Sequence, residues 1–191
     1  MIIKDLNIPK CLTKEKMFVS SYIQEVNFEN INSENLQTMK ELFIPNDKWG
    51  WHPLKKVYFT NFSAPNLQST ERMFYKIYTF KFLKLDGVIQ NIKISKLVTM
   101  KEMFSHCDSD FLSNFTLENI EFLELIHMER MFENFSLFIN FTFQYLNFYK
   151  SVSMDYMFLN CENSYYISFQ NINLSKTFIL NKIFNFIITF P

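Results

Sequence analysis

A six-residue segment that ends in phenylalanine recurs along the whole chain, and this repetition constrains the fold more than any other feature. The clearest copies are TMKEMF, HMERMF and SMDYMF, and the full set of repeat phenylalanines is Phe18, Phe43, Phe74, Phe104, Phe132, Phe158 and Phe184. Successive members lie 25, 31, 30, 28, 26 and 26 residues apart. Such a period is typical of proteins that stack one small unit on the next. We number the units one to seven by these phenylalanines.

A second set of apolar residues lies at a constant distance before each repeat phenylalanine. Counting back 15 residues gives Ile3, Phe28, Phe59, Ile89, Leu117, Phe143 and Phe169. Apolar and polar residues alternate around these positions, as in Val26-Asn27-Phe28, which is the pattern of a β-strand with one buried face. Because the strands recur without an encoded hairpin turn, we expect each strand to pair in parallel with the strand of the next unit.

The segment that ends at each repeat phenylalanine is predicted to form a short helix. Leu36, Met39 and Phe43 fall on one helical face. Thr38 and Glu41 have the spacing of a capping box. The sequence therefore predicts an α/β fold of about seven strand-turn-short-helix repeats with a parallel sheet, forming a single domain over residues 1–191. Its helices are expected to end near the seven repeat phenylalanines.

Asparagine recurs two residues after most of the strand positions, at Asn30, Asn61, Asn91, Asn119 and Asn171. We expect these residues to form an interior ladder, in which each side-chain amide bonds backbone groups of the neighbouring unit. The alternative is asparagine on a solvent-facing turn, enriched by mutational pressure. The 24 Phe and only 2 Gly indicate such pressure, because they point to an A+T-rich genome.

The segments INSENLQTMKELF, FSAPNLQSTERMF and IKISKLVTMKEMF resemble the BspA-like leucine-rich repeats, also called the 26-residue bacterial surface-protein repeat. The pattern M-x-x-M-F-x-x-C of that family ends in a cysteine, which is present in MFSHC at Cys107 and in MFLNC at Cys161. The resemblance covers essentially the whole chain. It implies a leucine-rich-repeat-like solenoid used for binding or adhesion, common at bacterial and protist surfaces and without catalytic residues to carry over.

Residues that could carry chemistry are few and scattered. Cys107 and Cys161 occupy the same repeat position two units apart, too far for a disulfide, and we expect both to pack in the core. Three cysteines in all fit a reducing compartment. The 3 His lie in unrelated contexts, and 2 Gly are too few for phosphate-cradling loops. We therefore expect no catalytic residues, no metal site and no cofactor, and a protein that is not an enzyme.

The charge balance bears on partners and location. Nineteen Lys and Arg face nineteen Asp and Glu, and only two of the cations are Arg, which disfavours nucleic acid as a partner. The N-terminal segment MIIKDLNIPK lacks the features of a signal peptide, and the apolar tail over 178–191 is too short and too interrupted for a membrane span. We expect a cytoplasmic protein without a membrane span, whereas the resemblance implies the cell surface or secretion.

The predicted function is a non-catalytic protein-interaction scaffold; the alternative is an adhesin-like fragment that binds a host protein or glycan. Strand alternation places Tyr58, Thr60 and Gln90 on the outward face. The insert at 44–56 carries Trp49 and Trp51, a residue type favoured in binding hot spots. We expect the contact zone at these five residues. The alternatives are that both Trp side chains fold back over the edge of the stack, and that the strand face is merely solvated.

Overall fold

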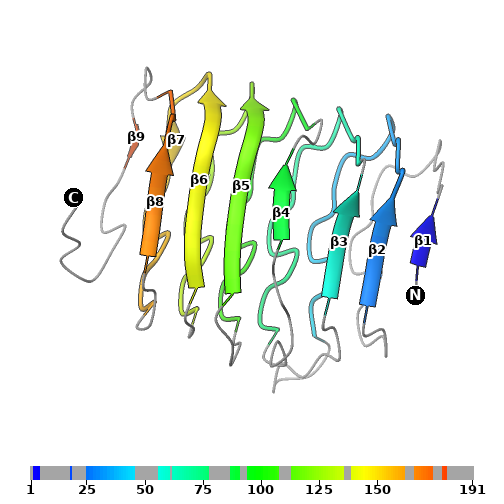
Figure 1. Ribbon diagram of the computed structural model, residues 1–191, viewed down its shortest axis with the longest axis horizontal. Helices are drawn as coiled ribbons and strands as arrows, with labels where there is room; N and C mark the ends of the chain where they lie inside the picture. The colour runs from blue at the N-terminus through cyan, green and yellow to red at the C-terminus, as the bar shows by residue number, and fades with distance from the viewer. Residues whose placement is uncertain are drawn as a thin grey trace.

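In the computed structural model of this chain, the described residues are 2–4, 18, 25–45, 56–60, 62–77, 87–90, 94–107, 113–135, 139–161, 166–173 and 178–179. Nine strands lie among them: β1 (Ile2–Lys4), β2 (Glu25–Glu29), β3 (Lys56–Thr60), β4 (Gly87–Gln90), β5 (Ser113–Phe122), β6 (Ile139–Phe148), β7 (Val152–Ser153), β8 (Tyr166–Gln170) and β9 (Phe178–Ile179). Figure 1 shows one strand of each unit standing beside the next along the length of the molecule.

The strands pair in parallel, as predicted. One sheet has the order β1-β2-β3, a second has the order β4-β5-β6-β8, and a third pairs β7 with β9. The pairing register joins equivalent residues of the repeat: Phe28 pairs with Phe59, and Leu117 pairs with both Ile89 and Phe143. A constant distance between strand position and repeat phenylalanine therefore predicts the register correctly, because each unit repeats the same path of the chain.

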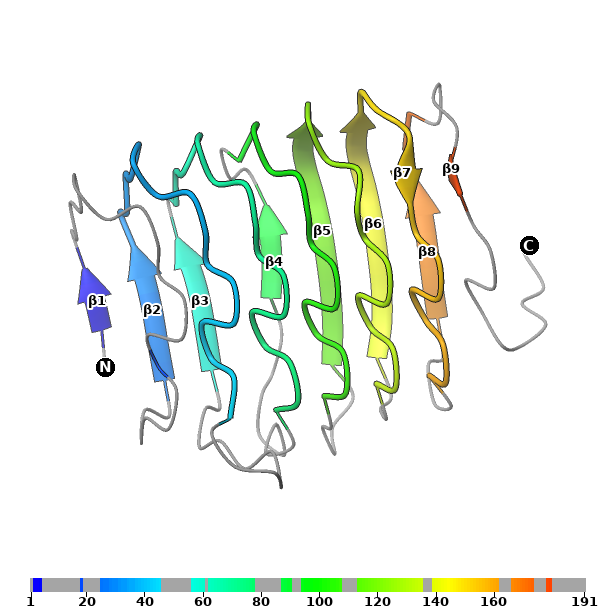
Figure 2. The ribbon, with the colours of Figure 1, turned by 180° about the vertical axis from the view of Figure 1, so that it is seen from behind.

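A second layer lies behind the strands. It consists of the segments 38–43, 69–74, 99–104, 127–132 and 153–158, which we call the turn layer (Figure 2). Isolated parallel bridges join its first residues in series: Thr38, Ser69, Thr99, His127 and Ser153. The turn layer thus links the third unit to the fourth through Ser69 and Thr99, which belong to units whose strands lie in different sheets.

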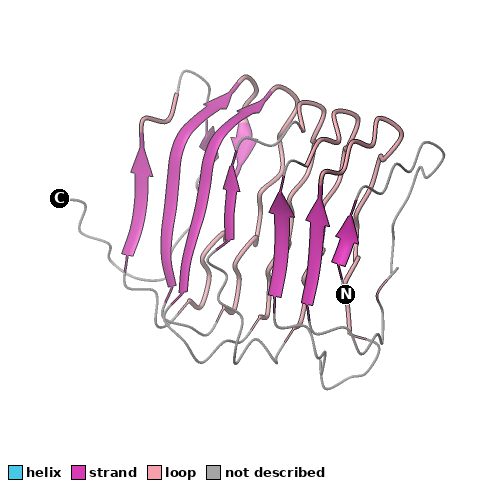
Figure 3. Cartoon of the chain, turned by 45° about the vertical axis from the view of Figure 1, so that its right-hand side comes forward, coloured by secondary structure: helices cyan, strands magenta, loops and turns pink. Residues whose placement is uncertain are grey.

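The predicted short helices are wrong wherever the structure describes them. The described residues contain no helix (Figure 3). The segment expected to end at Phe184 lies outside them, and so does the segment expected to end at Phe18, apart from Phe18 itself. In the five six-residue segments that the structure describes in full, the fourth residue has a positive φ of 53–59°, as in Glu41 (55°), Arg72 (53°) and Glu102 (54°). A residue in the left-handed region cannot continue a right-handed helix.

The backbone groups of the turn layer pair between units instead. The amide of Glu102 donates to the carbonyl oxygen of Glu129 (3.0 Å), and that of Phe104 donates to Met131 (2.9 Å). The expected cap residue Thr99 accepts a hydrogen bond from the amide of Lys101 (3.1 Å), two residues later, which is a local turn and not a helix cap. Inter-unit hydrogen bonds therefore satisfy groups that a helix would satisfy internally.

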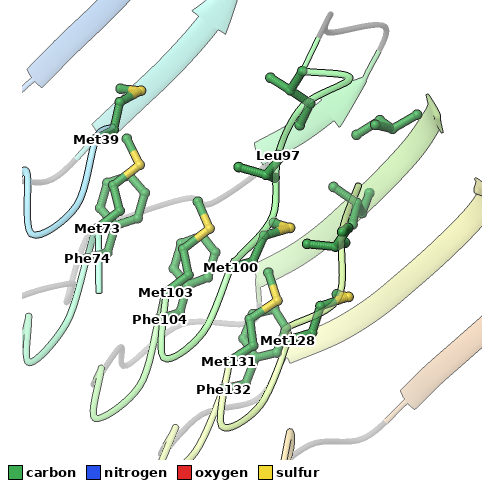
Figure 4. Packing of buried hydrophobic residues seen from close by; sticks show 14 of the residues in the cluster. Met39, Met73, Phe74, Leu97, Met100, Met103, Phe104, Met128, Met131 and Phe132 are labelled. Carbon is green, nitrogen blue, oxygen red and sulfur yellow. The ribbon is translucent and has the colours of Figure 1, made fainter. Parts of the chain in front are cut away.

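The core lies between the two layers and repeats from unit to unit. Consecutive repeat phenylalanines stack in one column, with ring centroids 5.1, 5.2, 5.1, 5.5 and 5.4 Å apart from Phe18 through to Phe158. From Phe43 to Phe158 each is preceded by a buried methionine or leucine, and Figure 4 shows three successive Met-Phe pairs in the same orientation, at Met73, Met103 and Met131. These phenylalanines and methionines form the core of the described part of the chain.

The two closing cysteines are buried and form no disulfide, as predicted. Each thiol also donates to the carbonyl oxygen of the repeat phenylalanine one unit earlier: Cys107 Sγ lies 2.8 Å from the Phe74 oxygen, and Cys161 Sγ lies 2.9 Å from the Phe132 oxygen. Both therefore connect adjacent units as well as filling space. Cys11 lies outside the described residues.

Candidate interaction surface

The predicted contact zone is described only in part. Tyr58 and Thr60 lie in β3, where they pair with Asn27 and Glu29, and Gln90 lies in β4 opposite Glu118. Only the backbone of these strand residues is described. Trp49 and Trp51 lie outside the described residues. The structure thus places three of the five predicted residues on neighbouring strands of the same face of the molecule.

Equivalent positions in later units show the outward face directly. In β5, Leu117 is fully buried whereas Thr116 and Glu118 are partly exposed, and β6 repeats this alternation around Phe143. The pattern breaks in β8, where Ser168 is buried and Phe169 is 37% exposed. Because β8 ends the described sheet, Phe169 stacks on Phe143 on one side (5.0 Å) without a further strand beyond it.

The three described members of the asparagine column do not lie in the interior. Asn30, Asn119 and Asn171 are exposed, so the interior ladder is wrong at these positions, while Asn61 and Asn91 lie outside the described residues. All three exposed asparagines have positive φ, at 54°, 53° and 51°. Asparagine is several-fold enriched in this conformation because its short side chain tolerates it. In the described units these asparagines thus mark a left-handed corner of the backbone, in a chain with only 2 Gly.

A side-chain ladder does exist, two residues after the repeat phenylalanines. Asn160 Nδ2 donates to Asn134 Oδ1 (2.8 Å), and Asn134 Nδ2 lies 3.0 Å from His106 Nε2. The other ring nitrogen, Nδ1, lies 2.7 Å from the hydroxyl of buried Ser105. Since Asn134 Nδ2 can only donate, the ladder requires an unprotonated Nε2 and hence a neutral imidazole.

The surroundings of His106 agree with a neutral ring. Partial burial lowers the pKa of His106 below its usual value; Glu133 and Glu102 oppose this change, and Lys76 and Arg130 reinforce it. The sequence suggested no such ladder, because the residue type at this position changes along the chain: Ser20, Pro45, Lys76, His106, Asn134, Asn160 and Phe186. Equivalence of the positions in the repeat is the signal that could have revealed it.

Charged side chains of the turn layer neutralise one another across units. Arg72 Nε lies 2.7 Å from Glu102 and its Nη1 lies 3.8 Å from Glu41, one unit to either side. Partial burial lowers the pKa of the Arg72 guanidinium, but its hydrogen bond with Glu102 and the nearby negative charges raise it overall. Arg130, the other arginine of the chain, bonds both carboxylate oxygens of Glu133 (3.1 and 3.2 Å). Both arginines occupy the same repeat position and both are paired.

Three exposed apolar side chains near the carboxyl ends of β5 and β6 were missed by the sequence analysis. They are Leu123 (39% exposed), Tyr145 (50%) and Tyr149 (52%). Tyr145 stands in the asparagine column, between Asn119 and Asn171. The signal that could have found it is this departure from the repeat, because a solvent-facing corner does not require an aromatic ring.

The described residues offer little for a cofactor. A cavity of about 30 Å³ lies inside the stack, lined by side chains such as Met39, Thr70 and Met100, and has room for only about two water molecules. Among the described residues, no three His, Cys, Asp or Glu side chains gather into a group that could hold a metal ion. The described part of the chain also has no helix of sufficient length and apolarity to cross a membrane.

No protein-family model, curated protein or solved structure matches the sequence. Inference about function therefore depends on the residues and their geometry.

Proposed function

We propose that this chain is a non-catalytic protein-interaction scaffold, a leucine-rich-repeat-like solenoid of the BspA-like type. The observation that carries the proposal is the division of each unit into constant and variable positions. Stacked phenylalanines and buried methionines repeat from unit to unit, whereas outward strand positions differ, as between Glu118 and Gln144. A constant interior with a variable surface is the arrangement by which repeat proteins present binding surfaces.

The paired charges support a protein partner over nucleic acid. Phosphate backbones are bound by unpaired Lys and Arg, but both arginines here already bond glutamate. The two closing cysteines support the BspA-like assignment. Cys107 and Cys161 each donate a hydrogen bond to the preceding unit, which gives the final cysteine of the M-x-x-M-F-x-x-C pattern a role between units.

Within this proposal the contact zone is Tyr58, Thr60 and Gln90, flanked by Trp49 and Trp51. The test begins with capture of partners on the immobilised chain from an extract of its host, identified by mass spectrometry. The double variant Tyr58→Ala with Gln90→Ala should then weaken binding by about fivefold or more, without a change in melting temperature. The matched control is the double variant Thr142→Ala with Gln170→Ala, which changes the residues equivalent to Tyr58 and Gln90 in later units.

Equal loss in both double variants would contradict a localised contact zone. Partners that are host surface proteins or glycans would favour the adhesin-like alternative. Turnover of a captured molecule by the purified chain would contradict a non-catalytic scaffold.

A further inference from the structure

The side chains of His106, Asn134 and Asn160 form a directed chain of hydrogen bonds, which we call the amide ladder. Asn160 Nδ2 donates to Asn134 Oδ1 (2.8 Å), and Asn134 Nδ2 donates to His106 Nε2 (3.0 Å). Both bonds run from the sixth unit toward the fourth. A histidine whose Nε2 accepts a hydrogen bond is neutral and carries its proton on Nδ1, which here lies 2.7 Å from the hydroxyl of buried Ser105. A second proton must therefore enter at Nε2, the atom that faces Asn134.

A proton on Nε2 is incompatible with the present orientation of the amides. The ring nitrogen becomes a donor that faces the Asn134 NH₂ group, which is also a donor. A half-turn of the Asn134 amide about χ2 exchanges its nitrogen and oxygen, which are similar in size, and brings Oδ1 opposite the ring. The Asn134 NH₂ group then faces that of Asn160, so Asn160 must turn in the same way. Two half-turns thus restore both hydrogen bonds, with donors and acceptors exchanged.

The backbone holds the three side chains in register while their amides turn. The amide of His106 donates to the carbonyl oxygen of Glu133 (2.7 Å), and the amide of Asn134 donates to that of Leu159 (2.8 Å). His106, Asn134 and Asn160 have nearly equal φ, at 59°, 53° and 58°. Because each unit presents its side chain from the same backbone conformation, reversal of the amide ladder requires no movement of one unit against the next.

The groups around the His106 ring leave it neutral until the pH becomes acidic. The described titratable and charged groups that face it come from the third, fourth and fifth units: Tyr75, Lys76, Glu102, Arg130 and Glu133. Partial burial lowers the pKa of His106 below the usual 6.5, and the two cations reinforce this change. The two carboxylates oppose it, but each is paired with an arginine, at 2.7 and 3.1 Å. The ring should therefore take up its proton only below pH 6.5.

We propose that protonation of His106 reverses the amide ladder, which makes the ladder a pH-sensitive switch between the fourth unit and exposed Asn160 in the sixth. In the reversed state His106 donates to Asn134, and Asn134 donates to Asn160. The first of these bonds starts from a cation, and such charge-assisted bonds are stronger than neutral ones, which favours reversal over loss of the bonds. Uptake of a proton in one unit thus exchanges donor and acceptor on a surface side chain two units away. The switch does not depend on the scaffold function proposed above.

The test is long-range HNCO nuclear magnetic resonance of the side-chain amides in the full chain. Spectra are recorded above and below the pH at which the ring ¹⁵N shifts of His106 show that it titrates. Above this pH, a coupling is expected from Asn160 Nδ2 to the side-chain carbonyl of Asn134. Below it, this coupling should be replaced by one from Asn134 Nδ2 to the side-chain carbonyl of Asn160. The backbone coupling from the Asn134 amide to the Leu159 carbonyl should persist throughout, since the stack stays intact.

Each other result overturns the proposal in a distinct way. Loss of the first coupling without appearance of the second would show that protonation breaks the amide ladder. Persistence of the first coupling after His106 is protonated would show that the amides do not respond to the ring. Absence of both couplings at every pH would remove the amide ladder itself. Unfolding before His106 gains its proton would exclude a switch in the folded chain.

The variant Asn134→Asp provides a second test, because a carboxylate can only accept hydrogen bonds. Bonds with both neighbours then require a charged ring, so the pH at which His106 titrates should rise by about one unit or more. The coupling from Asn160 Nδ2 to the side chain at position 134 should persist on both sides of the titration. The matched control is Asn119→Asp, which adds the same charge in the fifth unit at the same φ of 53°. An equal rise in both variants would assign the effect to net charge and contradict the amide ladder.

Discussion

Thr70 Oγ1 donates a weak hydrogen bond to the Sδ of Met103, 3.6 Å away, in the interior between the third and fourth units. In the other described units the position of Thr70 is a buried methionine: Met39, Met100, Met128 and Met154. The shorter side chain leaves the cavity of about 30 Å³ at this place. The cavity is thus explained by comparing Thr70 with the methionines at the equivalent position of the other units.

Thr70→Met should therefore stabilise the protein, by about 1–2 kcal/mol, because it fills the cavity and removes a buried hydroxyl. Chemical denaturation measured by tryptophan fluorescence provides the free energy of unfolding. Met128→Thr is the matched reverse change in a filled unit and should cost about 2–4 kcal/mol. A lower stability for Thr70→Met would show that the third unit cannot accept the larger side chain.

The left-handed corners predict a ranking at Asn119. Its φ of 53° suits glycine and asparagine but not a β-branched residue. Asn119→Gly should change stability by less than about 0.5 kcal/mol, whereas Asn119→Val should cost about 1–2 kcal/mol. If Gly and Val were equally harmful, the asparagine amide and not the backbone conformation would be the important feature.

Sequence reasoning succeeded where interactions repeat along the stack. The strands, their parallel register and the core phenylalanines could be predicted because each is set by a residue at a constant offset, such as Phe28, Leu117 and Phe143. The short helices could not be excluded, because spacing of Leu36, Met39 and Phe43 suits either a helix or a turn with the same buried face. Hydrogen bonds to the next unit decide between them, and such non-local bonds leave no mark in a six-residue pattern.

The predicted site shows the same limit. The asparagine column was found in the sequence, but its three described members are exposed and not buried, since exposed left-handed corners and buried ladders both favour asparagine. Tyr145 was visible as an exception in that column, and only its exposure of 50% identifies it as a surface feature.

His106 predicts a dependence of stability on pH. Its pKa is lowered from the usual 6.5 in the folded chain, chiefly by partial burial, so the unfolded chain binds the proton at a higher pH than the folded chain. The contribution to stability is therefore present above about pH 6.5 and is lost as the pH falls through the folded pKa. His106→Asn, which keeps a residue suited to the left-handed backbone, should flatten this slope between about pH 7.5 and about pH 5.5. If the free energy of unfolding of His106→Asn changed with pH as steeply as that of the parent chain, titratable groups other than His106 would be responsible for the pH dependence.

Cys107 allows a test of the thiol hydrogen bond. If Cys107 only fills apolar space, Ala should be tolerated better than Ser. If its donation to the Phe74 carbonyl oxygen matters, Ser should cost only about 1 kcal/mol and Ala about 2 kcal/mol, because serine keeps a donor and alanine leaves both a cavity and an unpaired oxygen. Thermal unfolding of the two variants provides the ranking, and Ala more stable than Ser would contradict the role between units.

The most direct measurement concerns the hydrogen bonds that join one unit to the next, since equivalence of the units supports every inference about their surfaces. Scalar couplings across hydrogen bonds, detected by long-range HNCO nuclear magnetic resonance, identify the carbonyl that each amide bonds. Couplings are expected from the amide of Glu102 to the carbonyl of Glu129 and from that of Phe104 to that of Met131. A coupling from the amide of Phe104 to the carbonyl of Met100, four residues earlier, would instead show a helix in the turn layer and contradict the stack of units described above.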